Sequence, residues 1–255
     1  MFQRNQLFQT LKPGETIHKP ALLSLLREQY PDARPATLDW RIYDLVQQGL
    51  LIRRGRGLYQ IVPDKGSKAL LVPNVPDELG QCAKKLKASF PLLACCVWST
   101  ALLYPFMQQQ PFITYWLIET EREGVNSVLD YLQTNQGRSS TKKAFPSGSA
   151  VMLASDISLA ERYQPDAQTL ILIKPLISEV PLQQTEAGFT VPTAEKILVD
   201  LLADNDVFNL FGEELPNLFE QINAQYILNY DRMRRYARRR HKLPDLDNHL
   251  ARLSK

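Results

Sequence analysis

The feature that most restricts the fold of this chain is a pair of short apolar runs separated by a glycine-rich basic turn. Residues 51–61 read LIRRGRGLYQI, in which two β-type runs flank a Gly-Arg-Gly turn. Glycines let a chain reverse direction sharply between two strands. The pattern therefore predicts a β-hairpin, with Arg53, Arg54 and Arg56 at or near its tip.

Three helical patterns precede this hairpin. The first lies over residues 2–11, and the second is the leucine-rich segment 21–30, ALLSLLREQY. The third is expected to begin near Pro35, because proline has no N–H to leave unpaired in a first helical turn, and to end at Gly49. Three helices followed by a hairpin is the order of a winged helix-turn-helix, which we expect over residues 1–62.

In a winged helix-turn-helix, the outer face of the third helix enters the major groove of DNA and the hairpin lies along the phosphate backbone. Thr37 and Arg41 are expected to contact base edges. The other arginines, Arg34, Arg53, Arg54 and Arg56, are expected to contact the phosphate backbone. Trp40 either touches DNA or packs against the hairpin. Asp39 and Asp44 would repel phosphate unless at least one of them faces away or pairs with an arginine. The DNA-contacting candidates of this region are Arg34, Thr37, Trp40, Arg41, Gln48, Arg53, Arg54 and Arg56.

The charge of the chain is unevenly distributed. Residues 1–62 contain nine Lys/Arg and five Asp/Glu, whereas residues 63–230 contain twelve and nineteen. Residues 231–242, DRMRRYARRRHK, contain seven and one. The chain therefore has a basic beginning, an acidic body and a basic late segment. A polyanionic partner is favoured near residues 1–62 and 231–242, and not near the acidic body.

The late basic segment is predicted to continue a helix that begins near residue 213. Arginines crowded on a helix repel one another unless an anionic partner screens them. DNA and an acidic protein surface both fit that description, as does a solvated helix end favoured by the helix dipole. The DNA-contacting candidates of this segment are Arg234, Arg235, Arg238 and Arg239.

The rest of the chain predicts a larger mixed domain. Residues 63–76 are expected to form a linker, and residues 77–255 alternate apolar runs with amphipathic helical patterns before turning helical from about residue 192. Alternation of this kind indicates an α+β (α/β-like) domain built on a sheet. The strand-like runs are LLACCVW at 92–98, FITYWLIET at 112–120, SAVMLAS at 149–155 and TLILIKPL at 169–176.

Catalytic motifs are absent from the sequence. It has no P-loop, no GxGxxG after a strand, no HExxH and no GxSxG. An alternative is a metal-dependent nuclease, with Glu119, Glu121 and Glu123 after a strand and Glu195-Lys196 as a distant partner. The same acidic cluster is also typical of a strand that runs into a helix. We therefore predict a protein that is not an enzyme and that needs no cofactor or metal.

Cysteine usage and hydropathy bear on the compartment. Cys82, Cys95 and Cys96 are odd in number and include an adjacent pair, which suits reduced thiols in a cytosol. No run approaches the roughly 18 apolar residues of a membrane-spanning helix. The first residues are polar where a signal peptide would need an apolar stretch. We expect a cytoplasmic protein without a membrane partner.

Three stretches are similar to proteins of the AbiEi antitoxin family of type IV toxin–antitoxin (abortive infection) systems. They are LDWRIYDLVQQGLLIRRGRGLYQI, VWSTALLYPF and VPTAEKILVDLL. The resemblance implies an N-terminal winged helix that binds operator DNA and represses its own operon, with residues 37–48 as recognition helix and 51–61 as wing. It also implies a larger antitoxic domain and a nucleotidyltransferase-like toxin as partner. The net acidic body departs from the positive surface of that family's C-terminal domain, which only 232–242 matches.

The sequence thus predicts a DNA-binding transcriptional regulator of the antitoxin type. Its expected partners are double-stranded operator DNA and the nucleotidyltransferase-like toxin. Two alternatives stay open: an interaction protein whose winged helix only docks a partner, and the nuclease described above.

Overall fold

The computed structural model describes residues 16–47, 51–55, 57–61, 70–136, 145–146, 148–158 and 168–253. The chain divides into two compact units, one formed by Met1–Leu70 with Gln225–Arg235 and the other by Leu71–Ala224 with Tyr236–Lys255. The division at residue 70 falls within the segment predicted as a linker, 63–76. The helix predicted over residues 2–11 lies outside the described residues.

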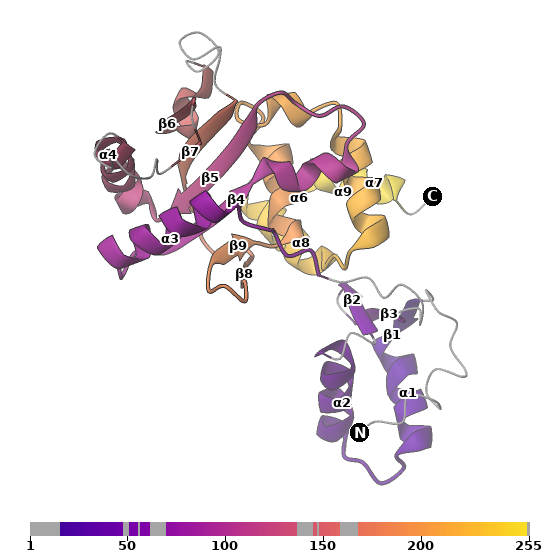
Figure 1. Ribbon diagram of the computed structural model, residues 1–255. Helices are drawn as coiled ribbons and strands as arrows, with labels where there is room; N and C mark the ends of the chain where they lie inside the picture. The colour runs from indigo at the N-terminus through magenta and orange to yellow at the C-terminus, as the bar shows by residue number, and fades with distance from the viewer. Residues whose placement is uncertain are drawn as a thin grey trace. The chain divides into compact units, whose positions relative to one another are not determined.

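The first unit combines two helices with a small antiparallel sheet of order β1-β3-β2 (Figure 1). The predicted second and third helices and the predicted hairpin all form, although the segment before α1 is a strand. Its elements are β1 (Thr16–His18), α1 (Lys19–Gln29), α2 (Pro35–Gln47), β2 (Leu51–Gly55) and β3 (Leu58–Ile61).

The core of the first unit is the apolar stripe that each helix turns inward. Leu22 and Leu26 of α1 are fully buried and pack with Leu38 and Ile42 of α2. Spacings of four residues place such side chains on one helical face. Strand residues such as Tyr59 complete the cluster and fix the hairpin against the helices.

The second unit is built on a mixed sheet of order β4-β5-β7-β6, in which β4 runs antiparallel to β5 while β5, β7 and β6 are parallel. A mixed α+β architecture was predicted and is confirmed here. The elements are α3 (Asp77–Ser89), β4 (Cys95–Ser99), η1 (Thr100–Phe106), β5 (Thr114–Thr120), η2 (Arg122–Gly124), α4 (Val125–Gln136), β6 (Ser149–Leu153), η3 (Ala154–Asp156), β7 (Thr169–Pro175), β8 (Leu182–Gln184), β9 (Thr190–Pro192), α6 (Ala194–Ala203), η4 (Asn209–Phe211), α7 (Leu215–Gln225) and α9 (Leu243–Arg252).

Helices cover both faces of this sheet (Figure 1), with α3 and α4 on one face and α6 on the other. Successive side chains of a strand point to opposite faces of the sheet, so a strand can pack against helices on both sides. Trp116 and Ile118 of β5 pack into the cluster that includes α3 and α4. Tyr115 points the other way, where its ring lies 6.1 Å from that of Phe211. Glu119 shares the face of Tyr115, which directs its carboxylate toward α6.

The chain between α7 and α9 departs from the long helix expected there. Helix α7 ends at Gln225, and a separate helix, α8 (Tyr230–Arg239), begins four residues after Tyr226. His241 then adopts a positive φ of 54°, which reverses the chain before α9. Among the described residues, none of the helices combines the length and the apolar character that crossing a membrane requires.

Candidate nucleic-acid interface

Helix α2 presents two chemically different faces. Pro35 occupies its first position, where a missing N–H costs no hydrogen bond. Leu38, Ile42 and Leu45 are each at most 3% exposed. The helix is therefore held by this apolar stripe, and the side chains between these positions are turned toward solvent.

The outer face of α2 carries polar and aromatic side chains. Thr37 is exposed, as is Arg34 just before the helix. Trp40 and Tyr43 are each 60% exposed, which is unusual for such large apolar rings. Of the two alternatives for Trp40, the outward one matches this exposure, since its ring is not enclosed by the core of this unit.

Arg41 differs from these neighbours because it is half-buried. Its guanidinium carbon lies 3.8 Å from the centroid of the Tyr30 ring, a stacked cation–π contact. Stacking fixes the plane of a guanidinium and leaves its edge groups to make hydrogen bonds. Arg41 is thus a preoriented side chain rather than a freely moving one.

The acidic residues of α2 are partly neutralised within the first unit. Asp39 forms an ion pair with Lys19, with 3.0 Å between Oδ1 and Nζ. The expectation was that one aspartate faces away or pairs with an arginine, and here the partner is a lysine. Asp44 is half-buried. The Asp39–Lys19 ion pair is exposed and adds little stability, but it offsets the negative charge of Asp39, which would otherwise repel phosphate.

The hairpin follows α2 directly in the chain. Its strands pair with Arg53 opposite Tyr59, and the register shifts between Arg53 and Gly55. Gly57 has a φ of +70°, a conformation that favours glycine, and its carbonyl accepts a 2.7 Å hydrogen bond from the Lys19 N–H. The turn is thereby tied to the start of α1.

Four of the predicted DNA-contacting side chains are not described. Gln48 and Arg56 lie outside the described residues, and Arg53 and Arg54 are described for their backbone only. Their contribution to an interface therefore stays a prediction from the sequence.

The arginines of α8 fall into two classes. Arg235 and Arg238 are exposed, and Arg234 is half-buried. Arg239 instead forms an ion pair with Glu179 and donates a 3.1 Å hydrogen bond to the Ser178 hydroxyl. The sequence predicted equal roles for these arginines. Arg239 is exposed as well, and it differs from Arg235 and Arg238 by its ion pair with Glu179.

A buried ionic cluster in the second unit was not predicted from the sequence. Its centre is the ammonium group of Lys196 on α6, whose side chain is fully buried. This group donates hydrogen bonds to Glu119 Oε1 at 2.6 Å, to Glu119 Oε2 at 2.8 Å and to Asp200 Oδ2 at 2.6 Å. The indole N–H of Trp98 donates to Glu119 Oε1 at 2.8 Å. All three hydrogens of the ammonium group thus have acceptors.

The cluster extends to further elements of this unit. Lys174 of β7, the register partner of Glu119 in the sheet, lies 3.5 Å from Asp200 and also pairs with Asp204. Tyr236 donates a 2.7 Å hydrogen bond to Asp200 Oδ1, and Arg240 pairs with Asp204. Three cations therefore balance three carboxylates: Lys174, Lys196, Arg240, Glu119, Asp200 and Asp204.

The pKa shifts in the cluster follow from this balance. Burial alone raises the pKa of Asp200, but the charges of Lys174 and Lys196 outweigh it and hold that pKa below its ordinary value. Burial lowers the pKa of Lys196, while Asp200 and Glu119 raise it well above the ordinary value. Asp200 is therefore anionic and Lys196 cationic at neutral pH, and the two form a fixed ion pair at the centre of the cluster.

Glu119 and Lys196, which the nuclease alternative named as distant partners, lie together in the structure as an ion pair. Glu121 and Glu123 are exposed, whereas Glu119 is only 1% exposed. Within the part of the chain that the structure describes, no three His, Cys, Asp or Glu side chains gather as metal ligands. Cys82, Cys95 and Cys96 are free thiols, as predicted.

A family model matches residues 37–255, and the chain therefore belongs to that family, which is described as a family of unknown function (DUF6577). The match begins at Thr37, near the start of α2, and runs through the hairpin and the whole second unit. No curated protein matches the chain.

Proposed function

We propose that this member of a family of unknown function is a DNA-binding transcriptional regulator. In this proposal the first unit is a winged helix-turn-helix, with α1 and α2 as the helix-turn-helix and the β2–β3 hairpin as the wing. The observation that carries it is the outer face of α2. That face exposes Thr37 and Trp40 while the opposite face is fully buried.

The chemistry of this face suits a duplex. A hydroxyl such as that of Thr37 can bond a base edge, and an exposed indole can contact a sugar or a thymine methyl group. Arg41, held in place on Tyr30, offers a directed guanidinium edge of the kind that contacts guanine. Exposed Arg34 stands at the start of the helix, where it suits a phosphate contact.

The wing contributes through its sequence. Arg53, Arg54 and Arg56 occur within four residues on a glycine turn, and the hairpin itself forms. Arginine is the side chain best shaped for phosphate oxygens and for a narrow minor groove. The basic balance of residues 1–62 adds a long-range attraction to DNA.

The finer proposal is that the protein is the antitoxin of a type IV toxin–antitoxin system and represses its own operon. It rests on the resemblance to the AbiEi antitoxins described above. On this proposal the protein acts in the cytoplasm, its first unit binds operator DNA, and its second unit serves the antitoxic function against a nucleotidyltransferase-like toxin.

The proposal is tested by fluorescence anisotropy with the full chain, using a labelled duplex from upstream of its own gene and a scrambled duplex of equal composition. We expect tighter binding to the upstream duplex. Trp40→Ala should reduce that preference by about tenfold, the cost of one or two base-level contacts. Phe112→Ala removes another exposed ring, 78% exposed and in the second unit, and should leave affinity unchanged. Equal affinity for both duplexes would refute sequence-specific regulation.

A second candidate is a protein-interaction role for the first unit. The exposure of both Trp40 and Tyr43 favours it, because large exposed rings are enriched at protein interfaces. The anisotropy experiment separates the two roles: a docking module would show no sequence preference on DNA, and Trp40→Ala would leave its weak duplex binding unchanged.

A further inference from the structure

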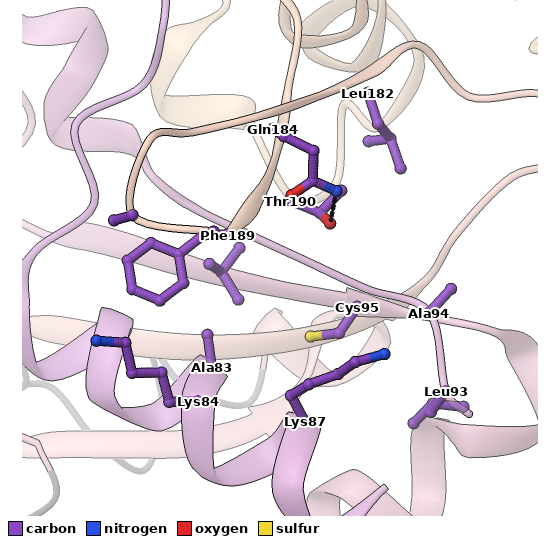
Figure 2. A pocket seen from close by; sticks show the side chains of 13 residues that line it. Ala83, Lys84, Lys87, Leu93, Ala94, Cys95, Leu182, Gln184, Phe189 and Thr190 are labelled. Carbon is purple, nitrogen blue, oxygen red and sulfur yellow. Dashed lines mark hydrogen bonds between the residues drawn. The ribbon is translucent and has the colours of Figure 1, made fainter. Parts of the chain in front are cut away.

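The second unit contains a pocket that the proposed function does not use. It has a volume of about 360 Å³ and lies between α3, the start of β4 and the β8–β9 hairpin (Figure 2). This volume is near the lower end of the range for small-molecule sites, roughly 300–1,000 Å³, and is too small for a dinucleotide.

The walls of the pocket are held firmly. Phe189 closes the hairpin turn, accepting a 2.9 Å hydrogen bond from the Thr185 N–H and donating one of 3.1 Å to the Thr185 hydroxyl. Its ring packs on α3 at Gly80, where a Cβ atom would lie 2.9 Å from the ring. The amide of Gln183 donates to the carbonyls of Leu71 and Pro192 at 2.8 and 2.9 Å. The pocket is therefore preformed.

The charge of the lining is positive. Lys84 and Lys87 of α3 both line the pocket, and none of its lining residues is acidic. Lys84 Nζ lies 5.6 Å from the centroid of the Phe189 ring, and Lys87 Nζ donates a 2.7 Å hydrogen bond to the Pro91 carbonyl. Burial, with a smaller effect of Glu119, raises the pKa of the Cys95 thiol to about 12, so this thiol adds no negative charge at neutral pH.

The rest of the lining is mainly apolar. Ala83, Leu93, Val97, Leu182 and Phe189 provide carbon surface. Figure 2 shows a polar pair facing them from the hairpin.

In that polar pair, the Gln184 amide donates a 2.8 Å hydrogen bond to the Thr190 hydroxyl. A hydroxyl that accepts such a bond can still donate its own hydrogen to a ligand. The pocket thus offers cations and a hydroxyl donor around an apolar interior.

We propose that this pocket binds a small organic anion with a planar apolar body, of the aromatic carboxylate class. The carboxylate pairs with Lys84 or with Lys87, whose ammonium groups point toward opposite ends of the pocket (Figure 2), and the ring lies against Phe189 and the aliphatic walls. A flat ring stacks well on an aromatic side chain, and an ammonium pairs with a carboxylate. A divalent phosphate without an apolar part would leave the carbon surface uncovered. The proposal does not depend on DNA binding.

The test is titration calorimetry on the full chain with benzoate, its neutral isostere benzamide and inorganic phosphate as three separate probes. We expect benzoate to bind with a Kd of about 1 mM or tighter. Benzamide should bind at least tenfold more weakly, and phosphate should neither bind in this range nor displace benzoate. Equal binding of benzoate and benzamide, or displacement by phosphate, overturns the assigned class; absence of saturable benzoate binding overturns the site.

Three variants locate the site. Lys84→Gln with Lys87→Gln should weaken benzoate binding about tenfold, while Lys85→Gln, an exposed lysine of the same helix outside the pocket, should not. Ala83→Leu keeps the charge and fills the interior, and it should weaken benzoate and benzamide alike. An unchanged melting temperature confirms that each variant is folded. Equal loss in Lys85→Gln and the double variant would show nonspecific attraction instead.

Discussion

Positive charge is used in opposite ways in the two units. In the second unit, Lys196 is enclosed by carboxylates with all of its hydrogens bonded, and its charge is balanced within the fold. In the first unit, Arg34 is exposed at the start of a helix whose outer face is polar and aromatic. The first arrangement fixes the sheet to a helix, and the second remains open to an anionic partner.

The difference shows that the sign of a segment's charge does not reveal its role. The second unit is acidic overall in sequence, yet its most constrained side chains include Lys174 and Lys196. Within α8, Arg238 and Arg239 are both exposed, and Arg239 is paired with Glu179. Burial and partners, not charge counts, separate structural cations from those available for binding.

The most direct test of this difference between the two units is to remove the central buried cation, Lys196. Lys196→Met removes the closest cation of the buried Glu119 and Asp200 and leaves Lys174 as the nearest one, and we expect the free energy of unfolding to fall by about 3–5 kcal/mol. Urea denaturation measures it. Lys85→Met, at an exposed position of α3, should change stability by less than about 0.5 kcal/mol. Similar losses in both variants would mean that the cluster has no special role.

The pH dependence of stability tests the same ion pairs without mutation. The pKa of Asp200 is below its ordinary value of 3.8, so the stability it contributes is present above about pH 4 and is lost as the pH falls further. The pKa values of Lys174 and Tyr236 are raised above 10.5 and 10.0, so their contributions are present at neutral pH and are lost above about pH 10. Thermal melting between pH 2 and 11 should show both losses, and Lys196→Met should reduce the acid one.

A smaller effect is expected from Tyr236→Phe. This change removes only the hydroxyl that donates to Asp200, a bond to a charged acceptor worth about 1.5–3 kcal/mol. Tyr104→Phe removes a hydroxyl bonded to the neutral Thr114 and should cost about 0.5–1.5 kcal/mol. Chemical denaturation of the two variants side by side measures the difference, and a reversed order would contradict the charged state of Asp200.

The smallest expected effects on stability concern two arginines near the end of α8, Arg238 and Arg240. Arg238→Ala should change the free energy of unfolding by less than about 0.5 kcal/mol, because the side chain is exposed. Arg240→Ala should cost about 1–3 kcal/mol, because it leaves Asp204 with one cation fewer. If Arg238 contacts DNA, only its variant should lower duplex affinity at full stability. Equal stability losses would remove the distinction between exposed and paired arginines.

Local patterns predicted much of the fold. The leucine stripes gave α1 and α2, proline marked the start of α2, and the glycine turn gave the hairpin. The four strand-like runs of the body became β4, β5, β6 and β7. The prediction was wrong for the late helix, which is divided after Gln225. The short strand Thr16–His18, which pairs with β3, was not predicted because its pairing depends on tertiary context.

The buried ionic cluster could not be predicted in full because its members are far apart in sequence. A signal was nevertheless present: Lys196 and Asp200 stand four residues apart within the apolar helix AEKILVDLLA, where charged side chains need buried partners. The partners Glu119 and Lys174 lie near the ends of β5 and β7. They become neighbours only through the register of these two strands in the sheet, which the sequence does not show. Similarly, the stacking of Arg41 on Tyr30 depends on how α2 packs beside α1 and is not visible in the sequence.

The salt dependence of duplex binding tests the central claim most directly. If α2 and the hairpin bind DNA through about four to six phosphates, the logarithm of affinity should fall with the logarithm of salt concentration with a slope near −4 to −5. Replacing Arg53, Arg54 and Arg56 together with alanine should flatten this slope by roughly two to three. An unchanged slope in a folded triple variant would contradict the claim that this hairpin holds the DNA backbone.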